Sequence, residues 1–285
     1  MRPYLRCLGP RRYTQKDKQL QKEAGVICLE LHGCANCDFV FPPEDEAMLH
    51  CPKCQQARYV DVASKKAQEM VYYFPIAERL KALMQAEKFQ HSVEYELRRR
   101  SNDNFMTDLQ DAPAWQEEMG TLPRRGNLHA LACFVCCLLI YCCLFAGGIR
   151  KLGLVYCSDG VKAFQRGDTS LVIDEFFIGS LPPQERYSPE NMLVFMMYES
   201  CMPQQKRSKY YDYAMRDLNL LYNRGVPDTR IESVFVLGAT LDLEGRYKCM
   251  GCQKFNAYYG CTVCYHRYVR GLHKKVIFTG LLVCL

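Results

Sequence analysis

The first feature of this sequence is an absence near its N-terminus. The first 22 residues contain seven Lys or Arg residues, a single acid (Asp17) and no apolar segment, so they do not form a secretory signal. Cysteines in a chain without such a signal are expected in a reducing compartment, as metal ligands rather than disulfides. The chain also lacks an internal repeat, which excludes a solenoid. Its net charge of +6 permits a polyanionic partner without requiring one.

Cysteine, in contrast, is abundant, with 18 residues in a chain of 285. Two C-x-x-C pairs separated by a thirteen-residue spacer lie near the N-terminus: Cys34, Cys37, Cys51 and Cys54. Four thiolates on two such pairs give Zn²⁺ its tetrahedral shell, and the spacing is close to that of a zinc ribbon. We therefore predict a structural zinc site in residues 28–60, with Cys28, His32 and His50 as nearby bystanders.

A second cysteine group lies toward the C-terminus. Its two pairs are separated by an eight-residue spacer: Cys249, Cys252, Cys261 and Cys264. These four thiols are able to close a second tetrahedral site, and His266 competes with them as the fourth ligand. With either ligand set, the zinc would be structural, because no coordination position stays open for catalysis.

Residues 150–285 are predicted to form an α/β segment. Its expected elements are three strands and one helix: Leu152–Cys157, Thr169–Gly179, Lys206–Arg224 and Glu232–Asp242. Asp159 follows the first of these strands and Asp242 ends the third. Carboxylates at the ends of separate strands are suited to a two-metal site for phosphoryl transfer. The alternative is that Asp159-Gly160 forms a turn and that Asp242 is a solvated strand end.

Several stretches resemble the CACTA-type (En/Spm-like) DNA transposases. "CSDGVKAF" and "SLVIDEFFIGSLPPQERYSPENMLV" are similar to their first-aspartate region, and "ATLDLEGR" with "QKFNAYYGCTVC" to their second. "CPKCQQARY" and "VYYFPIAERLKALM" are similar to their zinc ribbon and the helix after it. The resemblance covers most of residues 28–267. It implies an RNase H-like fold and a catalytic Asp, Asp and Glu, with Asp159 and Asp242 as the two aspartates and Mg²⁺ or Mn²⁺ as the catalytic ion.

The sequence departs from that family after Cys264, where no Asp or Glu follows. The catalytic glutamate and the distal histidines of the family are therefore missing from this stretch. We expect a truncated or degenerate transposase-derived protein with an incomplete RNase H-like domain, inactive by itself. The alternatives are a non-catalytic zinc-dependent module that binds DNA or protein, and a membrane-anchored zinc protein.

The membrane alternative comes from one apolar run, Leu128–Ile149, which contains 22 residues without a charge. It is long enough for a transmembrane helix and is flanked by basic residues. Because the family would pass directly into its first strand here, an insertion foreign to the ancestral fold is the preferred interpretation. The location is expected to be nuclear, or membrane-bound if the run is a true span.

The resulting organisation has five parts: a basic arm in residues 1–27, the ribbon in 28–60, a helical and loop connector in 61–127, the apolar run in 128–149 and the partial core in 150–285. DNA is the expected partner, with a homo-oligomer also possible. Transposases hold DNA largely through Lys and Arg contacts to phosphate. The favoured contacts are Arg267, Arg270, Lys274 and Lys275, ahead of the basic arm, Arg98–Arg100, and the group of Lys206, Arg207 and Lys209.

Overall fold

The structure is a computed structural model that describes residues 27–99, 106–120, 150–162 and 170–242, together with the backbone of residues 269–270 and 276–277. The predicted basic arm, the apolar run and the second cysteine group lie outside the described residues, as do Arg267, Lys274, Lys275 and the side chain of Arg270. Among the helices of the described part, none has both the length and the apolar character needed to cross a membrane.

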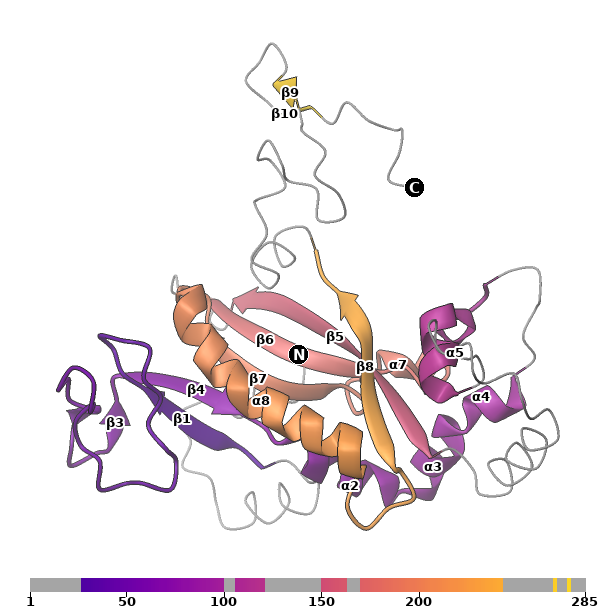
Figure 1. The fold of residues 1–285 in the computed structure, drawn as a ribbon, viewed down its shortest axis with the longest axis horizontal. Coiled ribbons are helices and arrows are strands. Elements are labelled where there is room, and N and C mark those ends of the chain that lie inside the picture. The colour runs from indigo at the N-terminus through magenta and orange to yellow at the C-terminus, as the bar shows by residue number, and fades with distance from the viewer. Residues whose placement is uncertain are drawn as a thin grey trace, which may run out of the picture.

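The described residues form a mixed α/β fold around a six-stranded sheet (Figure 1). In spatial order its strands are β1 (Leu29–Gly33), β4 (Glu69–Tyr73), β7 (Leu193–Glu199), β6 (Ser170–Ile178), β5 (Lys151–Lys162) and β8 (Ser233–Thr240). Every neighbouring pair is antiparallel except β5 and β8, which run parallel. The α/β expectation is thus confirmed.

The remaining elements are short, with one exception. Two small hairpins pair β2 (Tyr59–Asp61) with β3 (Lys66–Ala67), and β9 (Val269–Arg270) with β10 (Val276–Ile277). The short helices are α2 (Ile76–Met84), α3 (Glu87–Val93), α4 (Tyr95–Arg98), η2 (Leu109–Asp111), α5 (Pro113–Met119) and α7 (Pro183–Arg186). The exception is α8 (Gln204–Arg224), whose 21 residues lie diagonally across one face of the sheet (Figure 1).

Helix α8 forms because its apolar residues recur at helical spacing. Tyr210, Ala214 and Leu221 are buried against the sheet, where they join the main hydrophobic core. The helix ends at Gly225, whose φ of 70° lies in the left-handed region that glycine adopts without steric cost. The expected helix over Lys206–Arg224 is therefore present and begins two residues earlier.

The opposite face of the sheet is covered in part by α5. The indole of Trp115 is fully buried, and its ring centroid lies 5.3 Å from that of Phe235 in β8. The sheet leaves room for it at Gly153, where an added Cβ would come within 2.3 Å of the indole. Both faces around β5 and β8 are thus packed by helices.

Three strands of the main sheet were not expected from the sequence, and one is longer than expected. β1, β4 and β7 were not predicted, although they form one half of the sheet, in the order β1-β4-β7. β5 does not end at Cys157 but continues to Lys162, because its residues keep pairing with β6 as far as Lys162 with Ser170. Asp159 is consequently a strand residue that pairs with Ile173, and Asp159-Gly160 is not a turn.

Candidate metal centre and carboxylate pair

The four N-terminal cysteines converge on one point. The Sγ atoms of Cys34 and Cys54 are 3.4 Å apart and those of Cys37 and Cys51 are 3.5 Å apart. All four Sγ atoms lie within 4.8 Å of one another, and none forms a disulfide. A tetrahedral zinc with bonds of about 2.3 Å places its sulfur atoms about 3.8 Å apart. The donor set therefore fits a structural metal such as zinc, in a closed site.

The thiols of the cluster differ in their pKa values. A hydrogen bond from the Gln56 backbone N–H lowers the pKa of the Cys54 thiol to about 6. Burial raises the pKa of the Cys34 thiol despite hydrogen bonds from the backbone N–H groups of Asn36 and Cys37, and the pKa of Cys37 is raised to about 12. Zinc binds cysteine in the thiolate form, so binding of a metal here would release protons from Cys34 and Cys37.

Arg58 organises the loop between the two cysteine pairs. Its side chain is only 2% exposed, and its guanidinium lies 5.0 Å from the centre of the Phe41 ring. It donates from Nε to Nδ1 of His32 and from a terminal nitrogen to the backbone oxygen of Asp45. His32, a nearby spare ligand in the sequence, thus accepts a hydrogen bond from Arg58.

Lys206 joins the cysteine cluster to α8. Its Nζ donates to the backbone oxygens of Cys34 and Ala35, both at 2.9 Å, and to the Glu69 carboxylate at 2.7 Å. The Tyr210 hydroxyl, one turn further along α8, donates to the other oxygen of Glu69. An added Cβ at Gly33 would lie 1.9 Å from that hydroxyl, so this close approach requires glycine. The metal cluster is therefore fixed to the helix of the main sheet.

The basic residues of α8 are not equally available to a nucleic acid. Lys206 donates to the backbone of Cys34 and Ala35 and to Glu69 in β4, and the guanidinium of Arg207 lies over the Tyr198 ring at 5.7 Å. Lys209 is exposed. Of the three residues that the sequence offered here as phosphate contacts, Lys206 thus has a structural role.

The two predicted aspartates lie near the same end of the neighbouring parallel strands β5 and β8. The register of β5 and β8 pairs Cys157 with Thr240, the last residue of β8. Asp159 lies two residues beyond this pair, still within β5, and Asp242 lies two residues past the end of β8. Both aspartates are exposed. This arrangement offers hard oxygen donors of the type that Mg²⁺ prefers.

A buried carboxylate that the sequence analysis did not single out lies beside this pair. Asp174 in β6 is fully buried and accepts hydrogen bonds from the hydroxyls of Tyr156 at 2.9 Å and Tyr211 at 2.5 Å. Burial raises the pKa of Asp174 above its ordinary value. Because Asp174 pairs with Ser158, and Asp159 is the next residue, the aspartates of β5 and β6 belong to opposite faces of the sheet. Asp174 thus anchors α8 rather than adding a ligand for an ion at Asp159.

In the part of the chain that the structure describes, the four-cysteine cluster is the one group of three or more metal-binding side chains close enough to share an ion. Asp159 and Asp242 thus belong to no such group within those residues. Comparison of the chain with protein-family models finds no matching family, and comparison with curated proteins finds no match.

Proposed function

We propose that this chain is a transposase-derived DNA-binding protein in which a zinc ribbon braces a partial RNase H-like core. The ancestral chemistry would be metal-dependent cleavage and transfer of DNA strands. The observation that carries the proposal is the order β7-β6-β5-β8, with three antiparallel strands followed by a strand parallel to the first. An RNase H-like sheet is built in this order, and α8 precedes the parallel strand as its crossover helix.

The positions of the two aspartates are consistent with this proposal. Asp159 in β5 and Asp242 past the end of β8 each lie two residues beyond Cys157 and Thr240, the last pair in register on these neighbouring strands. They are the residues that would hold Mg²⁺ or Mn²⁺, which would activate the attacking oxygen of water or of a DNA 3′-hydroxyl. The exposed position of both carboxylates leaves room for a phosphodiester to approach.

Two carboxylates are fewer than a two-metal centre uses. Within the described residues, Asp159 and Asp242 belong to no group of three or more metal-binding side chains that could share an ion. We therefore expect the purified chain to bind DNA, with an affinity that falls steeply as salt rises, and not to cleave it.

The experiment combines DNA binding with a nicking assay. The full chain, purified with zinc, is titrated with duplex DNA at two salt concentrations, and supercoiled plasmid is incubated with Mg²⁺ or Mn²⁺. Salt-dependent binding without nicking is expected. Absence of binding at low salt would overturn the DNA-binding function. Nicking that disappears in Asp242→Ala, but persists in a control change of the exposed helix residue Asp212→Asn, would overturn the expected inactivity.

A second candidate function is a zinc-dependent binding module without ancestral catalytic metals. It is favoured by the geometry of the four-cysteine cluster, which fits a metal without any contribution from the aspartates. Mn²⁺ binding measured by electron paramagnetic resonance separates the two. The first proposal requires that Asp159→Asn and Asp242→Asn each weaken Mn²⁺ binding, whereas the second expects no change in either variant.

A further inference from the structure

The outer edge of β8 is the starting point. Among the described strands, none pairs with this edge, since β8 ends the sheet next to β5. Its sequence, SVFVLGAT, contains no charged residue, and of the described strands with four or more residues it is the one without a charge. Edge strands are commonly protected by charges or proline, because their unpaired N–H and C=O groups accept another strand. β8 has neither protection.

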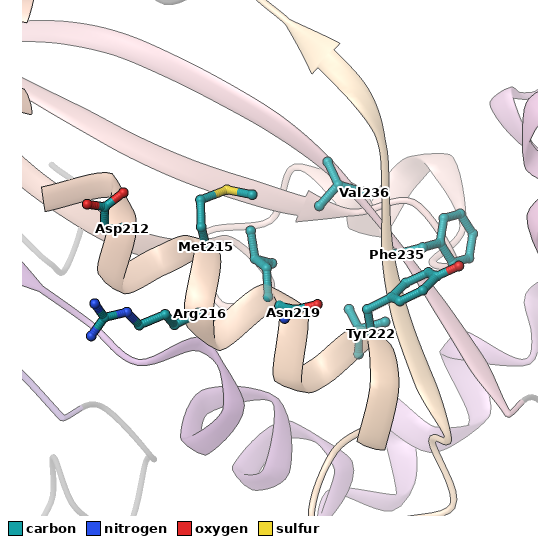
Figure 2. A pocket seen from close by; sticks show the side chains of 9 residues that line it. Asp212, Met215, Arg216, Asn219, Tyr222, Phe235 and Val236 are labelled. Carbon is teal, nitrogen blue, oxygen red and sulfur yellow. The ribbon is translucent and has the colours of Figure 1, made fainter. Parts of the chain in front are cut away.

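A groove lies beside this edge, between β8 and α8. Most of its lining side chains are apolar, and α8 also contributes Asp212, Arg216 and Asn219 to it. Its volume is about 620 Å³, and Figure 2 shows Met215 and Tyr222 of α8 beside Val236 and Phe235 of β8. Three of the lining side chains are substantially exposed: Met215 at 60%, Tyr222 at 42% and Val236 at 43%. Large apolar side chains exposed side by side next to an unpaired strand are typical of an interaction surface.

We propose that this surface binds a second copy of the chain, with the two β8 strands pairing antiparallel about a twofold axis. Two copies of β8 are able to pair with each other without charge repulsion. Ser233–Thr240 contains no charged residue, so like charges do not meet in any register of the two strands. The other described strands of the sheet carry acids or bases in their sequences and do not have this property.

The twofold arrangement also covers the groove. An axis perpendicular to the sheet places both copies of α8 on the same face, next to the joined strands. Met215 and Tyr222 then face the copy of α8 in the other chain, where thioether and aromatic groups attract each other. The two sheets together would form one continuous sheet.

The length of the edge limits the area that the dimer can bury. The eight residues of β8 extend about 26 Å at about 3.3 Å per residue. Together with the groove side chains, this edge must bury about 1,000 Å² in total to reach the lower limit for a specific interface.

The test is sedimentation of the full zinc-loaded chain over a concentration series, together with amide hydrogen exchange of β8. Val236→Lys places a lysine on the edge and is expected to raise the dimer dissociation constant at least about tenfold. Val236→Thr, nearly isosteric and uncharged, should keep the dimer. Val60→Lys is the matched control, because Val60 is 67% exposed in β2, away from this surface.

Each outcome decides the proposal. A dimer that is lost in Val236→Lys, kept in the other two variants and accompanied by slow exchange of β8 amides at high concentration supports it. A monomer at all concentrations overturns it, including the case in which β8 amides stay protected because other residues of the same chain cover the edge. Association that Val236→Lys leaves unchanged overturns it as well, because another surface then holds the copies together.

Discussion

The ammonium group of Lys206 lies 2.9 Å from the backbone carbonyl oxygen of Cys34, which joins a helix of the main sheet to the first metal ligand of the cysteine cluster. The same ammonium group pairs with Glu69, and both side chains are mostly buried. Metal binding at the cluster is therefore expected to be energetically coupled to the position of α8, since loss of either removes the partner of the other.

We expect Lys206→Met to destabilise the fold and to speed zinc release. The variant leaves the carbonyl oxygens of Cys34 and Ala35 without their donor, and a lost buried partner costs about 1–3 kcal/mol. Chemical denaturation and transfer of zinc to a chromophoric chelator measure the two effects. Lys209→Met on the exposed side of the same helix is the control. Equal behaviour of the two variants would contradict the connection.

Cys51→Ser should lower the zinc content by one ion per chain. The remaining three thiols cannot complete the tetrahedral shell, and the ribbon should become accessible to proteases, because metal binding provides its folding free energy. Mass spectrometry under native conditions counts the ions. Cys201→Ser, an exposed cysteine outside the cluster, should keep the full content. A full zinc count in Cys51→Ser would show that the cluster is not the metal site.

Arg58→Lys should destabilise the ribbon by about 2 kcal/mol, although the charge is conserved. A lysine cannot reproduce the fork that reaches His32 and Asp45 together, nor the stacking on Phe41. The midpoint temperature of thermal unfolding of the zinc-loaded protein measures this loss of stability. Arg224→Lys, on the exposed last turn of α8, is the matched control substitution. A decrease in stability of similar size in Arg224→Lys would contradict the role assigned to Arg58.

The buried carboxylate predicts a specific pH dependence. Burial raises the folded-state pKa of Asp174, so the stability from its protonated form is fully present below the unfolded pKa of about 3.9 and is lost as the pH rises through the folded pKa. Asp174→Asn removes this titration and retains hydrogen-bonding groups for Tyr156 and Tyr211. Its free energy of unfolding should therefore fall less than that of the wild type between pH 4 and 8.

The control for this prediction is Asp174→Ala, which leaves the tyrosine hydroxyls without an acceptor and should cost about 1–3 kcal/mol at every pH. Denaturant titrations at several pH values provide the comparison. If the difference in stability between the wild type and Asp174→Asn does not change with pH, Asp174 does not titrate as described.

The sequence was sufficient where a pattern is local. The periodicity of α8 and its glycine stop predicted a helix that the structure confirms, and the cysteine spacing predicted a cluster whose sulfur atoms converge. Both depend on residues within one segment. The apolar run in "TSLVIDEFFIG" likewise predicted β6 to within one residue at each end.

The sequence did not predict the elements and side-chain roles that depend on tertiary contacts. β4 precedes a strongly helical stretch and gains its partners, β1 and β7, from distant segments. β7 contains consecutive methionines, which have no preference for strands. Asp174 had one available signal, an acid inside an apolar strand, but only the tertiary structure supplies the tyrosines that bind it. Nothing local distinguished Arg58 from a surface arginine.

The two borders of the sheet differ in a way that limits how large an assembly can become. At the β1 border, Glu30 introduces a charge and the Phe41 backbone donates to His32, so the following loop already uses part of that edge. Among the described strands, the β8 border then has an edge that no strand or following loop pairs with. A chain with one open sheet edge would form a dimer and no larger assembly, whereas a chain with two open edges would polymerise into fibrils.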